Sequence, residues 1–289
     1  MLKFRNSRGG VLSLAANPYF ILTHIDGMTE GATSISSTTV GGVDGDTVNN
    51  VQANARPIII DLRVKDGVEV EVAKREILKV VKLKQIGTLE WKQSDRTITL
   101  SGIVESVEMP RWENGVTMQI TMHCSQPFWE DVEAVIQEIN EAIDVHYFTD
   151  DPYDMLYFPE EGIVLGEIDV LRTKEFYNAG DVAVGLEIVI TAVDEVTNPA
   201  IYDNKGNFLG VGYGDGAKKV TLKSGDNIVI TTHKGHKTIK LNGVNVISKI
   251  KPRSTWLQLE TGDNTFTINS DDESISNMNF TISYKQRYV

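Results

Sequence analysis

The sequence predicts a mainly β protein, with an N-terminal β domain that carries one α-helix and a C-terminal antiparallel β-sandwich. Three patterns support this prediction. Residues 96–130 resemble two long strands joined by a turn, residues 66–83 show a helical periodicity, and the second half holds short strand-like segments at regular spacing. The chain has 289 residues, 41% of them hydrophobic, which is enough for about two domains of ordinary size.

The chain begins with three predicted strands, Lys3–Asn6, Val11–Leu14 and Tyr19–Ile25, and Arg8-Gly9-Gly10 supplies the turn between the first two. The segment 26–54 that follows is rich in Gly, Ser, Thr and Val, so it has high β propensity but few large apolar side chains. This composition fits a protruding hairpin that borrows its packing from a neighbouring subunit, and it fits a plain surface loop equally well.

A strand and a helix come next. Arg56–Val64 is the strand, and Asp66 followed by Glu69 fits the capping-box pattern that starts a helix. The helix is predicted to run to about Leu83, with its buried side formed by apolar residues at spacings of three and four. These residues are Val70, Ala73, Ile77, Val80 and Val81.

The long hairpin follows a further predicted strand, Gly87–Gln93. Its first strand, Arg96–Met109, shows one step in the apolar alternation near Ser101-Gly102, which predicts a β-bulge there. Pro110–Gly115 ends in Asn-Gly, a strong turn signal. The return strand, 116–123, alternates strictly between apolar and polar residues, so one face should be buried and the other wet.

We place a domain boundary just beyond Trp129, which gives an N-terminal domain of residues 1–130 and a C-terminal domain of residues 131–289. The apolar residues at 132, 135, 136, 139 and 143 predict a helix, followed by an acidic connection at Asp150-Asp151-Pro152. The remaining segments read as short strands with turn signals between them, which is typical of an antiparallel sandwich. They are Gly162–Val170, Glu175–Asn178, Gly185–Ala192, Ala200–Asp203, Lys218–Leu222, Asn227–Thr232, Lys237–Leu241, Gly243–Val246, Thr255–Leu259, Asn264–Asn269 and Met278–Tyr284.

Composition excludes several classes of protein. The net charge of -12 disfavours a nucleic-acid partner, because an acidic surface is repelled by phosphates. The single cysteine, Cys124, excludes a disulfide scaffold or a cysteine-rich zinc site. No apolar run approaches the ~20 residues of a membrane-spanning helix. The apolar patch after the N-terminus is shorter than a signal-peptide core, so we expect synthesis and retention in a cytoplasm and no membrane contact.

The motifs that could carry chemistry favour ordinary turns. His233 and His236 lie on a predicted hairpin turn with no acidic or cysteine neighbour, so the sequence predicts no metal site there. The glycine-rich stretch 210–216 leads into a strand, whereas a phosphate loop leads into a helix. Asp203–Asn207 lacks the closing glutamate of a calcium loop. The sequence therefore predicts no catalytic residues, no cofactor and no enzyme.

Four groups of residues, in order along the chain, resemble the distal tail proteins of siphophages and related prophages of Gram-positive bacteria. The first three are the strand starting at Arg56 with its helix, leading to Gly87-Thr88-Leu89; the strand from Asp95 to Gly102 with its continuation to Val107; and the closing segment 124–129 (CSQPFW). The fourth group lies in the second half: Asn178–Val182, Gly185, Asn198–Ile201 and Leu257–Asn264.

The resemblance implies a structural hub with a galectin-like or jelly-roll C-terminal sandwich. Residues 1–130 would form a hexameric ring, possibly in stacked rings, at the end of the tail tube. The implied partners are further copies of the chain, the tail tube protein, a tail-associated tip protein and a receptor-binding protein. The implied location is the tail tip or baseplate of a virion assembled in the host cytoplasm.

A glycan-binding sandwich that acts directly on the cell wall is the alternative. Sugar sites need an exposed aromatic ring among polar groups, and Trp256 and Tyr213 are the candidate contacts in the second domain. Trp256 lies in an alternating segment, so the sequence leaves open whether its ring faces solvent or packs in the sandwich.

Overall fold

A computed structural model of the chain describes residues 1–29, 31–42, 44–111, 116–139, 142–145, 167–170 and 172–289. The chain divides into two compact units. Unit 1 contains residues 1–133 together with 287–289, and unit 2 contains residues 134–286. The prediction of a mainly β protein with one α-helix and a C-terminal antiparallel sandwich is confirmed for the described residues.

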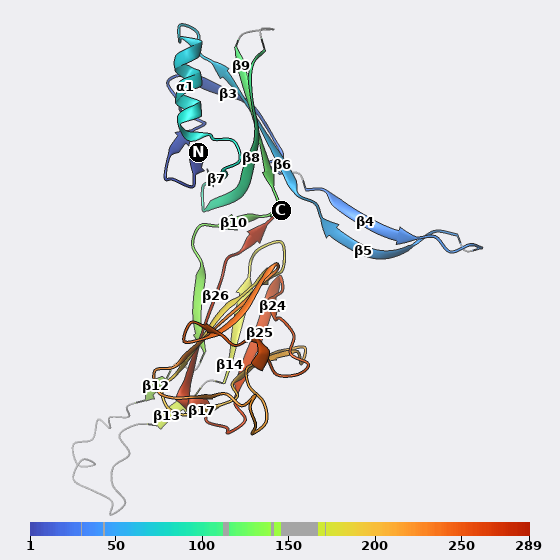
Figure 1. The fold of residues 1–289 in the computed structure, drawn as a ribbon, viewed down its shortest axis with the longest axis vertical. Helices are drawn as coiled ribbons and strands as arrows, with labels where there is room; N and C mark the ends of the chain where they lie inside the picture. The colour runs from blue at the N-terminus through green and yellow to red at the C-terminus, as the bar shows by residue number, and fades with distance from the viewer. Residues whose placement is uncertain (30, 43, 112–115, 140–141, 146–166, 171) are drawn as a thin grey trace, which may run out of the picture. The chain divides into compact units, whose positions relative to one another are not determined.

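Unit 1 is built on an antiparallel sheet in the order β2-β1-β7-β8-β9-β6-β3, with β10 paired to β8 and β27 paired to β10 (Figure 1). Its side chains alternate between a buried and a wet face, as the sequence pattern of the return strand predicts. The strands are β1 (Leu2–Asn6), β2 (Val11–Ser13), β3 (Phe20–Asp26), β6 (Arg56–Val64), β7 (Ile86–Lys92), β8 (Thr97–Arg111), β9 (Thr117–Cys124), β10 (Trp129–Asp131) and β27 (Arg287–Tyr288).

The helix α1 (Val70–Val80) packs on the buried face of this sheet through Ala73 and Ile77, and Val81 just beyond it is also buried. The predicted cap at Asp66 is wrong. Asp66 and Gly67 instead form a tight turn, with Gly67 at φ +83° and the Val68 amide donating to the Lys65 carbonyl. The helix starts after Glu69, which makes no side-chain cap hydrogen bond.

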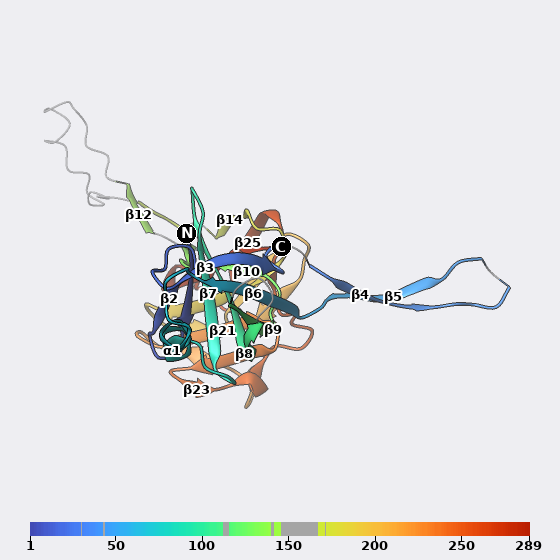
Figure 2. The same cartoon turned by 90° about the horizontal axis from the view of Figure 1, so that it is seen from above.

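Segment 26–54 is a hairpin of β4 (Thr33–Thr38) and β5 (Thr47–Ala53), which form a two-stranded sheet of their own. Of the two alternatives that the sequence left open, the structure shows the hairpin, and its packing against a neighbouring subunit stays a prediction. Every residue of both strands is exposed. Seen from above, the hairpin reaches well away from the sheet of unit 1 (Figure 2).

The bulge predicted at Ser101-Gly102 is not there. The alternation through Ile98, Leu100, Gly102 and Val104 is unbroken, and the register against β9 shifts at Glu105, between Val104 and Ser106. Gly102 takes an inward position that has no room for a side chain, because a Cβ there would lie 2.6 Å from Cys124 Sγ. Ile103 consequently points outward and is exposed.

Unit 2 is a sandwich of a six-stranded and a four-stranded antiparallel sheet. The first contains, in order, β11 (Val135–Ile139), β26 (Met278–Tyr284), β16 (Glu187–Ala192), β21 (Asn227–His233), β22 (His236–Leu241) and β23 (Val244–Asn245). The second contains β14 (Thr173–Asn178), β25 (Gly262–Asn269), β18 (Ala200–Asp203) and β19 (Phe208–Gly210).

Short two-stranded pairs and two 3₁₀ turns complete unit 2. The pairs are β12 (Ala142–Val145) with β13 (Glu167–Val170), β15 (Val184–Gly185) with β24 (Gln258–Leu259), and β17 (Val196–Thr197) with β20 (Thr221–Leu222); the turns are η2 (Ile247–Lys249) and η3 (Ile275–Asn277). Apolar residues from both large sheets form one core. Ile188, Ile230 and Ile282 lie in one row of the larger sheet, and Phe266 and Ile268 come from the smaller.

The helix predicted from the apolar residues at 132–143 is wrong. Residues 135–139 form β11 and residues 142–145 form β12. The β-branched residues here satisfy their backbone groups by pairing with β26, from Val135 with Tyr284 to Ile139 with Phe280. The turn signal at 112–115 and the acidic connection at 150–152 lie outside the described residues.

Candidate functional site

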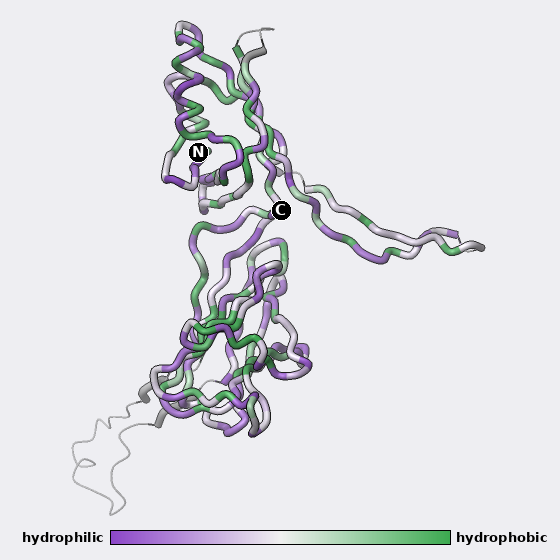
Figure 3. The backbone as a smooth tube through the Cα atoms, in the orientation of Figure 1, coloured by the Kyte–Doolittle hydropathy of each residue, from purple (hydrophilic) through white to green (hydrophobic). Residues whose placement is uncertain are grey.

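The strands of the hairpin β4–β5 are exposed along their whole length. Ile35 and Val51 are direct cross-strand partners, yet they are 64% and 56% exposed, so their apolar contact area is left uncovered. Along the hairpin the hydropathy is mostly intermediate or polar (Figure 3). An isolated two-stranded hairpin is only marginally stable in water, which makes an uncovered apolar pair here a candidate contact surface.

Trp256 lies in unit 2 beside a hollow of about 180 Å³. The ring is half-buried and packs against the core, and the ammonium group of Lys237 lies 5.6 Å from the ring centroid. The lysine occupies part of the ring face that a sugar would need.

Several of the polar groups that line this hollow are engaged within the chain. Asp203 accepts hydrogen bonds from the backbone amides of Lys205 and Asn207, which makes residues 203–207 the tight turn that the sequence predicts. The Gln258 side chain donates to the carbonyl of Thr232 at 2.9 Å, and Asn264 is likewise bonded to the backbone of its own loop. Few donors are therefore left to orient a ligand in the hollow.

Tyr213, the second candidate sugar contact, is half-buried in the loop after β19, and it is not among the residues that line the hollow at Trp256. Its backbone amide donates to the carbonyl of Lys218 at 3.2 Å. The structure thus gives each aromatic residue its own surroundings and does not bring the two into one site.

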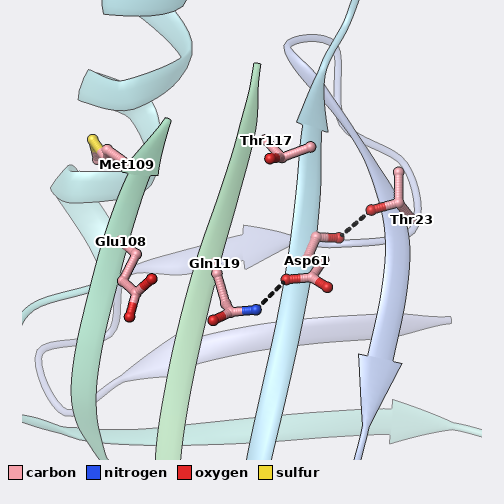
Figure 4. A pocket seen from close by; sticks show the side chains of 6 residues that line it. All are labelled: Thr23, Asp61, Glu108, Met109, Thr117 and Gln119. Carbon is pink, nitrogen blue, oxygen red and sulfur yellow. Dashed lines mark hydrogen bonds between the residues drawn. The ribbon is translucent and has the colours of Figure 1, made fainter. Parts of the chain in front are cut away.

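A second hollow, of about 200 Å³, lies on the wet face of the unit 1 sheet (Figure 4). Gln119 Nε2 donates to Asp61 Oδ1 at 2.9 Å, and Thr23 Oγ1 donates to the backbone carbonyl of Asp61 at 3.0 Å. Glu108 is the cross-strand partner of Gln119, and Met109 and Thr117 complete the lining. This part of the face is acidic, and polar cross-strand rows of this kind are usual on the wet face of an antiparallel sheet.

Within the described residues, no group of three or more His, Cys, Asp and Glu side chains could hold a metal ion. His233 and His236 are cross-strand partners at the β21–β22 turn. No helix in the described part of the chain is long and apolar enough to cross a membrane.

Residues 179–288 match the family model described as "Siphovirus-type tail component, C-terminal domain". This part of the chain holds the fourth group of resembling residues except Asn178, which lies just before it. Over these residues the resemblance to siphophage tail proteins is confirmed. We call residues 179–288 the tail-component region.

One solved structure extends the likeness in fold to the whole chain. The crystal structure of the Dit protein (gp 19.1) of phage SPP1, described as a paradigm of the hub adsorption apparatus in phages that infect Gram-positive bacteria, has a TM-score of 0.66 at 14% identity. Two structures of the phage P2 baseplate in its activated conformation, with Ca and with Sr, have TM-scores of 0.45 and 0.46 at 13% and 14% identity. Each comparison covers 100% of both chains. No curated protein sequence matches.

Buried asparagines explain three motifs of the tail-component region and its border. The Asn178 side chain donates to the carbonyls of Val182 and Leu259, and its oxygen accepts from the amide of Gly180. Asn264 Oδ1 accepts from the amide of Glu260, and its Nδ2 donates back to the carbonyl of Glu260. Each side chain replaces missing backbone partners in a loop that leaves a core strand.

Asn198, in the motif Asn198–Ile201, also replaces missing backbone partners with its side chain, and its own backbone has φ +50°. Its oxygen accepts from the amide of Val220 at 2.9 Å, and its Nδ2 donates to Asp271 Oδ2 at 2.8 Å. Gly212 passes so close that a Cβ there would lie 2.2 Å from Asn198 Oδ1. The glycine-rich stretch 210–216 therefore needs a glycine at position 212 for packing around Asn198. Asparagines beside the turn signals Ala-Gly, Pro and Gly-Asp are the sequence signal for these loops.

The single cysteine has no chemical role that the geometry supports. Cys124 lies on β9 with its side chain fully buried. Burial raises the pKa of its thiol to about 11, against the smaller opposing effect of the nearby Arg56 guanidinium. A thiol of this kind packs as a small apolar side chain.

Proposed function

We propose that the chain is a distal tail protein of a siphophage or a prophage, a structural hub component located at the tail tip or baseplate of the virion. The observation that carries this proposal is the match of residues 179–288 to the siphovirus-type tail component, together with the likeness in fold to SPP1 Dit over the whole chain. The acidic composition and the absence of a metal-holding group among the described residues are compatible with a structural role.

In this proposal unit 1 forms a hexameric ring and the hairpin β4–β5 supplies a contact between neighbouring copies. The hairpin forms a two-stranded sheet of its own and presents Ile35 and Val51 to solvent, so association would cover apolar area that the single chain leaves exposed. Unit 2 would remain available to dock other tail proteins. The proposed partners are the tail tube protein, a tip protein and a receptor-binding protein.

The double substitution Ile35→Ser and Val51→Ser in the full chain should weaken self-association by about fivefold or more, because the two side chains form the apolar centre of the proposed contact. Sedimentation velocity across a concentration series, with negative-stain images at the highest concentration, measures this. The wild-type chain is expected to form rings under these conditions.

The matched control is Val244→Ser, which removes an equally exposed valine (67%) from β23 of unit 2. It should associate like the wild type. If the hairpin variant and the control behave alike while the wild type assembles, the contact lies outside the hairpin.

A glycan-binding function has one observation in its favour, the half-buried Trp256 ring beside a hollow. We expect no saturable binding of the full chain to a panel of bacterial wall polysaccharides, because Lys237 covers part of the ring and the neighbouring polar groups are already bonded. Isothermal titration with the wild type, Trp256→Ala and Tyr213→Ala tests this. Tight binding that either substitution abolishes would make the glycan module the better account.

A further inference from the structure

The chain enters unit 2 after Glu133 and returns to unit 1 for its last three residues. There β27 pairs antiparallel with β10, Trp129 opposite Tyr288 and Glu130 opposite Arg287. Through β10 this short strand is joined to β8 and hence to the main sheet of unit 1. Residues 287–289 therefore complete unit 1 although unit 2 lies between them and the rest of that unit in the sequence.

The side chains of β27 also bind it to β10. Arg287 Nε donates to Glu130 Oε1 at 2.7 Å, and Arg287 Nη2 lies 2.6 Å from the same oxygen. The two side chains are 16% and 31% exposed, so solvent screens this ion pair less than a fully exposed one. Tyr288 OH donates to Asp131 Oδ2 at 3.0 Å, which adds a second bond between the strands.

Tyr288 also belongs to the apolar core of unit 1. Its side chain is buried in the same cluster as Trp129, and the guanidinium carbon of Arg96 lies 3.8 Å from its ring centroid. Burial, together with the negative charge of Asp131, raises the pKa of the Tyr288 hydroxyl, so the ring stays neutral at physiological pH. Removing β27 would thus expose part of the unit 1 core and also leave β10 without its pairing partner.

The link from unit 2 to β27 is short. Only Lys285 and Gln286 separate the end of β26 from the start of β27. On the unit 2 side Tyr284 is buried in the core, and its hydroxyl donates to the carbonyl of Tyr177 at 2.9 Å. A residue spans at most about 3.3–3.6 Å, so two linking residues cannot absorb a large displacement of either anchor.

We propose that residues 287–289 form a strap that couples the local stability of unit 1 around β10 to the integrity of β26 in unit 2. When β26 loosens, Arg287 and Tyr288 lose their positions and the edge of unit 1 opens with them. The coupling is mechanical and needs no ligand, and its two-state element is the paired or released β27. If the chain acts as the proposed hub, a partner that perturbs β26 in unit 2 would thereby change the local stability of unit 1 around β10.

Hydrogen–deuterium exchange of the full chain tests the strap in a double-mutant cycle, in which two changes are made separately and together. Phe280→Ala loosens β26, because this ring is fully buried in the core of unit 2, and Ile282→Val is a milder variant if the first does not fold. The second change removes residues 287–289. Lys285→Ala, an exposed residue of the link, is the control.

Exchange at 129–131 is expected to rise on the order of tenfold in Phe280→Ala, or less in Ile282→Val, and to remain at the wild-type rate in Lys285→Ala. Removing residues 287–289 should itself raise the amide exchange rate at 129–131, while β16 and β21 keep their protection. Adding the β26 substitution to this deletion should then cause no further change in exchange at 129–131. Unchanged exchange at 129–131 in the β26 variants, or an equal increase with and without residues 287–289, would overturn the proposal.

Discussion

Replacing Ile77 by aspartate is expected to unfold unit 1. Ile77 lies on α1 with no exposed surface, in the core shared with Phe4, Leu62 and Leu89. A carboxylate at this position has no cationic partner among the described residues of the core, and burying such a group costs at least about 3 kcal/mol. Because domains of this size are stable by only about 5–15 kcal/mol, calorimetry of the full chain should show the unit 1 transition lost or shifted far down in temperature.

The matched control introduces the same carboxylate on the opposite side of the helix. Arg75 is exposed on α1, so Arg75→Asp should shift the melting temperature of unit 1 by only a degree or two. Lys74→Ala, a truncation on the half-buried flank, should also be nearly silent. A melt of Ile77→Asp that matches wild type would show that the buried side of α1 is misassigned.

The second large effect is expected from Asn198→Leu in unit 2. The substitution leaves the buried amide of Val220 without its acceptor, removes the donor to Asp271, and places a branched side chain at φ +50°. An unsatisfied buried amide costs about 1–3 kcal/mol and the left-handed backbone about 1–2 kcal/mol. The free energy of unfolding of unit 2, measured in urea, should therefore fall by about 2–5 kcal/mol. The slope of that free energy against urea concentration should not change.

Two further variants separate these contributions. Asn198→Gly removes the side-chain hydrogen bonds but tolerates the backbone conformation, so it should be less destabilising than leucine by about 1 kcal/mol. Asn204→Leu makes the same exchange in the exposed turn between β18 and β19 and should be almost neutral. Equal stability of Asn198→Leu and Asn204→Leu would contradict the role assigned to Asn198.

The strands could be predicted from the sequence because their signal is local. The alternation of Met118, Ile120 and Met122 with polar residues gives both the strand and its buried face. The segment 132–143 was misread because Val135 and Ile139 are four apart, as on one side of a helix. What decides its structure is β26, about 145 residues further along the chain, and no local pattern reports a partner at that distance.

The candidate surfaces were less predictable for a similar reason. Whether Trp256 is free to bind depends on Lys237, and whether Gln258 can orient a ligand depends on the carbonyl of Thr232. These contacts are set by the three-dimensional packing. The exposure of β4 and β5, in contrast, follows from their composition, because a strand pair without large apolar side chains cannot pack a core of its own.

The burial of Cys124 has a consequence for a chain that is made inside a bacterium and, on the proposed function, works outside one in several copies. With a pKa of about 11, only about one thiol in ten thousand is a thiolate at pH 7, and the sulfur is covered by protein. Oxidants met outside the reducing cell therefore find no reactive thiol at Cys124. In the proposed ring, the burial of Cys124 would also keep neighbouring copies from being cross-linked by a disulfide when the particle leaves the reducing cell.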